Sequence, residues 1–297
     1  MYHVGIDLGG TKIEGVIIDP ERISEPVARL RCATGADRGY DHILGQIAGL
    51  VEELRGACPD EFPNVIGMGT PGTVDPKTKL MRGSNTQCLN GRPLKADIES
   101  RTGLSFAVAN DANCFALAEA TLGVARGYET VFGIIMGTGC GGGFVVNGKV
   151  LSGCHGIAGE WGQMIVEPGG VESGYGTRGT VETYLAGPAL EKFYAQQSGE
   201  KLLLKEIVAR VGHDAAAAET IERLKTYFAR SLAFIIDTFD PHAIVVGGGV
   251  GNLEVLYTQE MRDRISEVIF TPTFEAALLK PQLGDSAGVF GAAMLTI

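Results

Sequence analysis

Residues 5–18 contain the first group of side chains suited to phosphate chemistry. An apolar run that carries Asp7 leads into Gly9-Gly10-Thr11-Lys12, and a second apolar run follows. This pattern predicts a β-hairpin, because glycine adopts a positive φ at a tight turn without steric cost. Backbone N–H groups at such a turn point into one concavity that suits a phosphate, and Thr11 adds a hydroxyl donor. Asp7 then holds a phosphate-bound Mg²⁺ directly or through water. Taken alone, the stretch also fits an ordinary hairpin.

A second stretch, residues 131–146, repeats this plan. An apolar run enters the tip Gly137-Thr138-Gly139-Cys140-Gly141-Gly142-Gly143, and another apolar run leaves it. Gly133-Ile134 in the second copy corresponds to Gly5-Ile6 in the first. Two weakly similar halves, each opening with a phosphate-type hairpin, predict a duplicated α/β fold that binds a nucleotide between them.

Three carboxylates have settings that suit a reaction or a ligand. Asp111 stands between an apolar run, 106–109, and a helical pattern, where a general base is well placed; the alternative is a structural N-cap. Glu160 and Glu182 lie in glycine-flanked stretches and are either ligand contacts or solvated surface acids. The single tryptophan, Trp161, is either a core residue or a wall on which a sugar stacks.

The elements that position these groups follow from periodicity. Residues 40–56 form an amphipathic helix, with apolar side chains at Ile43, Ile47, Leu50, Val51 and Leu54 and a closing glycine. Further helices are expected at 93–102, 114–123, 181–197, 215–238 and 289–295. Buried strands are expected at 65–72, where the strand runs into a Gly-Pro turn, at 106–109, and at 243–249, where the strand ends in three glycines. Strands alternating with helices predict an α/β fold.

Composition excludes several classes of protein. The chain has 297 residues, 45% of them hydrophobic and 20% charged, so it can bury substantial cores. Its net charge of −10, without a basic block, argues against duplex DNA or an anionic membrane as a partner. With neither a signal-peptide pattern nor 18 consecutive apolar residues, the chain is expected in the cytoplasm. Six cysteines without a C-x-x-C pair are expected to be free thiols.

The motifs together resemble a known family. Asp7-x-Gly-Gly-Thr11, Asn110-Asp111, Gly137-Thr-Gly139 and Gly247-Gly-Gly249, in this order, are similar to the actin-like ATPase fold of sugar kinases. Gly159-Glu160-Trp161-Gly162 and the stretch 176–182 narrow the resemblance to the ROK (repressor, open reading frame, kinase) family across essentially the whole chain. The resemblance implies a duplicated, ribonuclease H-like α/β fold of two lobes with a cleft between them. The lobes are expected at 1–112, completed by 285–297, and at 113–284.

The resemblance also implies site roles. Asp111 is the general base that takes the proton from the attacking hydroxyl of a hexose, expected to be the 6-hydroxyl, and Asp7 is the Mg²⁺ residue. The phosphates of ATP are assigned to Gly9, Gly10, Thr11, Lys12, Gly137, Thr138, Gly139 and Gly141, and the adenosine to Gly248 and Gly249. The sugar is assigned to Gly72, Asn85, Asn110, Glu160, Gln163 and Glu182. Lys12 has the alternative of being merely exposed.

The chain departs from the family at the metal site. Relatives usually hold zinc with one histidine and three cysteines, and these positions here are Gln163, Ser173, Tyr175 and Thr180. One amide and three hydroxyls do not make a zinc site, so we expect no structural zinc. Gln163 still donates and accepts hydrogen bonds, but it neither titrates nor binds metal.

The expected activity is ATP-dependent phosphorylation of a hexose. Residues 159–162 and the loop Leu89-Asn90-Gly91-x-Pro93 favour fructose or mannose, and glucose and N-acetylated hexosamines remain open. Two other classes are a non-catalytic sugar-binding protein and a sugar-sensing repressor. Repressors of this kind carry a helix-turn-helix ahead of the first strand, where only Met1–Val4 stand here, and with a net charge of −10 we do not expect this class. The expected partners are therefore a hexose and, by the family resemblance, a second copy in a homodimer, with no nucleic acid and no membrane.

Overall fold

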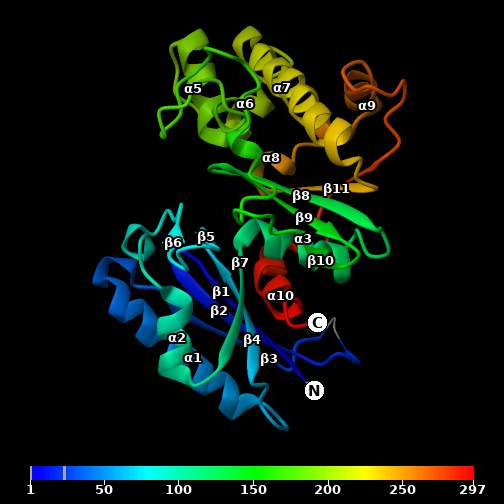
Figure 1. Ribbon diagram of the computed structural model, residues 1–297. Helices are drawn as coiled ribbons and strands as arrows, with labels where there is room; N and C mark the ends of the chain where they lie inside the picture. The colour runs from blue at the N-terminus through cyan, green and yellow to red at the C-terminus, as the bar shows by residue number, and fades with distance from the viewer. Residues whose placement is uncertain (1, 23–24) are drawn as a thin grey trace. The chain divides into compact units, whose positions relative to one another are not determined.

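The computed structural model describes residues 2–22 and 25–297 and consists of two compact units (Figure 1). Unit 1 comprises 1–129, 143–158 and 282–297, and unit 2 comprises 130–142 and 159–281. This division differs from the expected boundary after residue 112, because the helix that follows packs inside unit 1. There, a Cβ added to Gly291 of the C-terminal helix would lie 1.7 Å from the backbone oxygen of Cys114.

Unit 1 is built on a five-stranded sheet that places the candidate residues at the carboxyl ends of its parallel strands. Its order is β3-β2-β1-β4-β7, with bounds β1 (His3–Leu8), β2 (Lys12–Ile18), β3 (Ala28–Ala33), β4 (Val65–Thr70) and β7 (Ser105–Asn110). β1 and β2 form the predicted antiparallel hairpin, and β1, β4 and β7 run parallel. In this register Asp7 lies beside Gly69, and Thr70 beside Asn110. The carboxyl ends of three parallel strands therefore meet where the chemistry was expected.

Helices cover both faces of this sheet. The predicted apolar face of α1 (Tyr40–Ala57) is buried, and α1 packs against β2 and β3. The other helices of unit 1 are α2 (Leu94–Thr102), α3 (Asp111–Thr121) and α10 (Ala287–Met294), and α10 packs on β1 and β4 (Figure 1). A two-stranded ribbon, β5 (Thr73–Val74) and β6 (Met81–Arg82), follows β4 in sequence.

Glycine at position 67 lets β4 approach α10, and we expect Gly67→Ala to destabilise the protein strongly. The added Cβ would lie 1.6 Å from Ala292 O, so strand and helix must separate, at a cost of about 3 kcal/mol. Gly49→Ala is the control, since a Cβ there meets nothing within 4 Å in α1; it should stabilise by about 0.5–1 kcal/mol. Thermal unfolding of both variants measures this, and similar melting temperatures would contradict the close packing.

The second sheet repeats the plan of the first. Its order is β10-β9-β8-β11-β12, with bounds β8 (Thr130–Met136), β9 (Cys140–Val146), β10 (Lys149–Val150), β11 (Ala243–Gly247) and β12 (Ala277–Leu279). In both sheets the central strand has its hairpin partner on one side and a parallel strand on the other (β2 and β4 beside β1, β9 and β11 beside β8). The predicted duplication is thus visible strand by strand.

Unit 2 also carries most of the remaining helices, and one of them differs from expectation. The bounds are α4 (Glu182–Leu185), α5 (Gly187–Ser198), α6 (Leu204–Ala209), α7 (Ala215–Phe239), α8 (Gly248–Gly251) and α9 (Gln259–Ser266). The single helix predicted over 181–197 is wrong, because Ala186 is extended (ψ 146°) and separates α4 from α5. Pro188 causes the break, since a continuous helix would place its ring against the carbonyl of Tyr184. Over the part of the chain that the structure describes, none of the helices is both long and apolar enough for a membrane span.

Candidate functional site

The first phosphate-type turn is tightly held in unit 1. The Gly9 N–H donates to Lys12 O at 2.9 Å, and the Thr34 hydroxyl donates to Gly9 O at 2.6 Å. Neither Gly9 nor Gly10 has a positive φ, so the expected reason for glycine here is wrong. Glycine is needed at position 9 because a Cβ would lie 2.9 Å from Lys12 O, whereas one at Gly10 would meet only the Thr86 hydroxyl at 3.7 Å. The turn therefore leaves open space beside Gly10.

Lys12 is half-exposed but has an acidic partner. Its Nζ lies 3.3 Å from Glu14 Oε2, and the buried Glu14 also pairs with Arg29 and Arg31. Because Glu14 is shared among three cations, part of the positive charge of Lys12 is left for a phosphate. Lys12 is thus both exposed and ion-paired, and its role toward a phosphate stays a prediction.

Asp7 lies near the end of β1, with its carboxyl group close to Gly69, Gly288 and the buried thiol of Cys114. A Cβ added to Gly69 would lie 3.2 Å from its Oδ1, and one added to Gly288 would lie 2.9 Å from its Oδ2. Burial, and next the negative charge of Asp111, raise the pKa of Asp7 from 3.8 to about 6. Carboxylate oxygen is a ligand that Mg²⁺ prefers, and Mg²⁺ needs only one or two carboxylates besides waters and phosphates. Asp7 in this glycine-walled space therefore fits a phosphate-bound Mg²⁺.

Asn110 and Asp111 divide two tasks at the start of α3. The Asn110 side chain caps the helix by accepting the Asn113 N–H at 2.8 Å, so the alternative that Asp111 is the N-cap is wrong. Asp111 Oδ1 accepts the N–H of Ala112 at 2.8 Å. Solvent reaches the Asp111 side chain, yet protein surrounds it closely enough that burial raises its pKa. Asp111 is thus a carboxylate with a raised proton affinity and no capping duty.

The other two sugar candidates of unit 1 lie in turns after β4. Gly72 has a φ of 127°, and a Cβ there would lie 2.7 Å from Arg82 O. Asn85 is exposed between the buried residues Ser84 and Thr86. Asn90 holds this loop, because its side chain accepts the Ser84 N–H and donates to Ser84 O, both at 2.9 Å.

The second glycine-rich tip meets two other segments of unit 2. The Gly137 N–H donates to Gly139 O at 2.9 Å, and Gly137 O accepts the N–H of Gly187, the first residue of α5, at 2.8 Å. A Cβ on Gly137 would lie 4.0 Å from Gly249 N, while Gly249 has nothing within 4 Å of its own Cβ position. Gly248, with a φ of 83°, turns tightly against Met136. The tip, the β11–α8 turn and the N-terminus of α5 therefore lie together in unit 2, with the N–H groups of Gly137 and Gly187 already donated to backbone carbonyls.

Sequence reasoning missed the α5 N-terminus as part of this group. The available signal was Gly187-Pro188, because proline in the first turn of a helix is a typical start. Of the predicted tip residues, Thr138 lines the adjacent cavity described below. Gly141 instead supplies a carbonyl that accepts the Trp161 indole N–H at 2.8 Å.

Glu182 is not a solvated surface acid. Its Oε2 accepts the Cys140 N–H at 3.0 Å, and a Cβ on Gly139 would lie 2.7 Å from the same oxygen. Glu160 is half-buried and precedes the short 3₁₀ turn Trp161–Gln163, in which the Gln163 side chain is exposed. Trp161 itself is 1% exposed and packs edge-on against Phe132. It is therefore a core residue and not a wall for a sugar.

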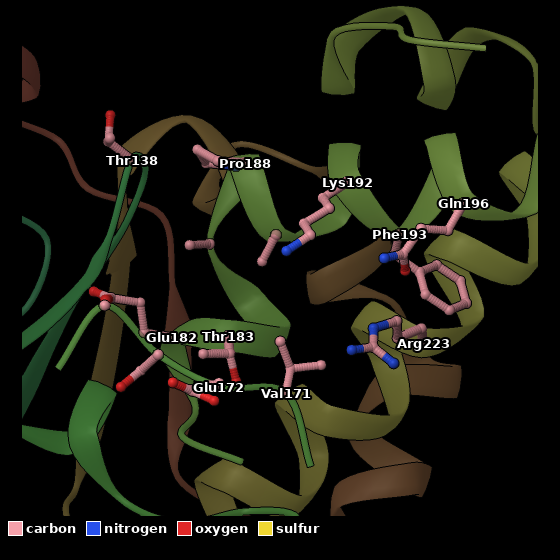
Figure 2. Close-up of a pocket in the computed structure, with 14 residues that line it drawn as sticks. Thr138, Val171, Glu172, Glu182, Thr183, Pro188, Lys192, Phe193, Gln196 and Arg223 are labelled. Carbon is pink, nitrogen blue, oxygen red and sulfur yellow. The ribbon is translucent and has the colours of Figure 1, made fainter. Parts of the chain in front are cut away.

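A cavity of about 460 Å³ adjoins this part of unit 2. Thr138 lines it from the tip, Glu182 from α4, Lys192 and Phe193 from α5, and Arg223 from α7 (Figure 2). The wall between Glu182 and Arg223 is formed by residues 171–174.

Residues 163–180, which include the four positions compared with the zinc ligands that the resemblance implies, are ordered by backbone hydrogen bonds. Gly179 O accepts the N–H groups of Val166 and Glu167 at 2.8 and 3.1 Å, and the Gly179 N–H donates to Val171 O at 2.7 Å. Of the four replaced ligand positions, Gln163 and Tyr175 are exposed and Ser173 and Thr180 are buried. Among the described residues, no three His, Cys, Asp or Glu side chains are grouped to hold a metal. The absence of zinc stays a prediction.

Comparison with known proteins finds sugar kinases that match essentially the whole chain. The N-acetyl-D-glucosamine kinase of Photobacterium profundum is 36% identical over 100% of this chain and 99% of its own length. The kinase of the same name from Vibrio vulnificus is 37% identical over the same shares. The crystal structure of a ROK hexokinase from Thermus thermophilus has a TM-score of 0.88 at 31% identity, covering 99% of this chain and 97% of that one.

A second solved structure holds ligands. The ROK family glucokinase of Streptomyces griseus, in complex with glucose and AMPPNP, has a TM-score of 0.74 at 30% identity over 99% of both chains. The predicted actin-like ATPase fold is thereby confirmed. The sequence matches the ROK family over residues 3–297, and the chain therefore belongs to the ROK family.

Proposed function

We propose that this protein transfers the terminal phosphoryl group of ATP to the 6-hydroxyl of an N-acetylated hexosamine, N-acetyl-D-glucosamine in the first place. That it is a sugar kinase rests on family membership and on full-length kinase relatives. The observation that carries the chemistry is Asp111, a carboxylate released from capping by Asn110 at the strand edge where Asp7 and the Gly9–Lys12 turn also lie.

The earlier preference for fructose or mannose has weak support. It depended on residues 89–93 and 159–162, yet Asn90 serves to hold its own loop and Trp161 is buried in the core. A residue whose side chain stabilises the fold gives no information about which sugar the protein binds. The relatives named above are N-acetyl-D-glucosamine kinases, which favours the N-acetylated hexosamine that the sequence left open.

In the proposed mechanism the protein supplies a general base, positive charge for the phosphates and groups that orient the substrates. Asp111 accepts the proton of the attacking hydroxyl, and its raised pKa brings it closer to the pH at which a general base is most effective. Lys12 and the N–H groups of the two glycine-rich turns bind phosphate oxygens, which positions the group to be transferred. When bound, Mg²⁺ would be held by Asp7 and would neutralise phosphate charge.

The remaining site residues belong to the same proposal. Gly72, Asn85, Asn110, Glu160, Gln163 and Glu182 are assigned to the sugar, and Gly248 and Gly249 to the adenosine. Cytoplasmic location and a homodimer remain predictions.

A substrate panel tests the proposal. We expect N-acetylglucosamine to give the highest kcat/KM in a coupled assay of ADP release with Mg-ATP, at least about 10-fold above fructose, mannose, glucose and N-acetylmannosamine. Removal of divalent metal with EDTA should stop turnover, and Mg²⁺ without zinc should restore it. Fructose or mannose as the preferred sugar would overturn the proposed substrate, and sugar binding without turnover would indicate a non-catalytic protein.

A further inference from the structure

Arg223 of α7 directs its charge at aromatic rings. The guanidinium carbon lies 4.2 Å from the ring centroid of Tyr184 in α4, 4.5 Å from that of Phe193 in α5 and 5.2 Å from that of Tyr227 in α7. Its Nε is buried and has no hydrogen-bond partner among the described residues. A cation over a ring face is attracted by the negative face of the ring. Arg223 therefore joins α7 to both α4 and α5.

Two of these rings also hold the loop 167–171. The Val171 N–H donates to the Tyr184 hydroxyl at 3.4 Å, and a Cβ on Gly170 would lie 2.1 Å from that hydroxyl. The Tyr227 hydroxyl donates to Glu167 Oε2 at 3.1 Å. Tyr184 and Tyr227 lie against each other, with their centroids 4.0 Å apart. The loop 167–171 is thus held by the hydroxyl groups of Tyr184 and Tyr227. The guanidinium carbon of Arg223 lies 4.2 Å from the ring centroid of Tyr184.

Glu182 depends on the same support. It is the first residue of α4, which has only four residues, and so short a helix does not hold its orientation by itself. Tyr184 is the large side chain by which α4 contacts α7. Glu182 lines the cavity on the tip side and Arg223 on the α7 side (Figure 2). The contact between Arg223 and Tyr184 therefore fixes the helix that carries Glu182.

We propose that Arg223 is a positioning residue for sugar recognition, which holds α4 and the loop 167–171 so that Glu182 keeps its place beside the tip at Gly139-Cys140. The inference rests on the proposed function, in which Glu182 binds the hexose. Arg223 thereby gives this segment a second support, a cation over aromatic rings, besides the backbone hydrogen bonds at Gly179.

Kinetics of Arg223 variants test the proposal. Arg223→Met should raise the KM for the sugar about 10-fold and change the KM for ATP less than about 2-fold, while Arg223→Lys, which keeps the cation, should stay within about 3-fold of wild type. Arg55→Met is the matched control, because Arg55 lies 5.0 Å from the Phe62 ring centroid in unit 1, on α1. The double variant Arg223→Met/Glu182→Gln should be no worse than Glu182→Gln alone, since a residue that acts through another gives non-additive effects.

Hydrogen exchange gives a readout that does not need turnover. Arg223→Met should speed amide exchange in residues 167–185, including Val171, and leave β1–β2 unchanged. Unchanged exchange in 167–185, additive effects in the double variant, or equal rises in both KM values would each overturn the proposal. Two other results would contradict the proposed function and not the role of Arg223. One is a wild-type protein that phosphorylates no sugar of the panel, and the other is a Glu182→Gln variant with a normal KM for the sugar.

Discussion

Replacing Asp111 with asparagine is expected to lower kcat by about 10²–10⁴-fold, because asparagine cannot accept the proton of the sugar hydroxyl. The change should leave α3 intact. Asn110, and not Asp111, caps the helix, and the asparagine oxygen can still accept the Ala112 N–H that Asp111 accepts at 2.8 Å. We expect the KM values for sugar and ATP to change by less than about 3-fold, since the interaction removed is one that matters in the transition state.

The control for Asp111→Asn is Asp41→Asn. Asp41 is likewise an exposed acidic residue in the first turn of a helix, but it lies in α1 and not at the carboxyl ends of the parallel strands. Any effect of removing a negative charge near a helix N-terminus is therefore present in both variants. Steady-state kinetics should show a normal kcat for Asp41→Asn. If Asp111→Asn keeps more than a tenth of the wild-type kcat, another group is the base.

Both glycine-rich turns could be predicted from the sequence because their pattern is local. An apolar run, a short glycine-rich tip and a second apolar run place two strands side by side whatever the rest of the chain does. The duplicated sheet followed from finding the pattern twice, and the structure shows the same order of neighbours around β1 and β8. The division into units could not be predicted in this way, because it depends on the packing of α3 against α10, helices far apart in sequence.

The candidate site was predicted in part. Asp111 and Glu182 were found from their settings, but what each contacts depends on neighbours that no local pattern specifies: Asn110 capping α3, and Cys140 donating to Glu182. The reason given for glycine at positions 9 and 10 was wrong, since close approach to Lys12 O and not a positive φ is what requires Gly9. Contacts across space, such as Arg223 with three rings, leave no periodic signal in the sequence.

Asp7→Asn is expected to abolish activity and to stabilise the protein at neutral pH. Burial and the charge of Asp111 raise the pKa of Asp7 to about 6 in the folded protein, against 3.8 ordinarily. The folded state therefore disfavours the charged form of Asp7. The contribution of Asp7 to the free energy of unfolding is greatest below pH 4, falls as the pH rises to about 6 and is constant above. The shift corresponds to about 2 kcal/mol after allowance for solvent around the half-buried carboxyl, and asparagine removes this cost.

The pH dependence of the melting temperature shows whether the charge of Asp7, and not a change in packing, causes the gain in stability. The melting temperature of Asp7→Asn should exceed that of wild type by a few degrees at pH 7.5, and the difference should vanish below pH 4, where Asp7 of wild type is protonated in both states. Wild-type activity should fall as the pH drops below about 6, because protonated Asp7 cannot hold Mg²⁺. Mg-ATP should raise the melting temperature of wild type and not of the variant, since a ligand stabilises only the state that binds it. A change in packing would raise the melting temperature by the same amount at pH 4 and pH 7.5. That result would contradict the inference that the charge of Asp7 is what destabilises the folded protein.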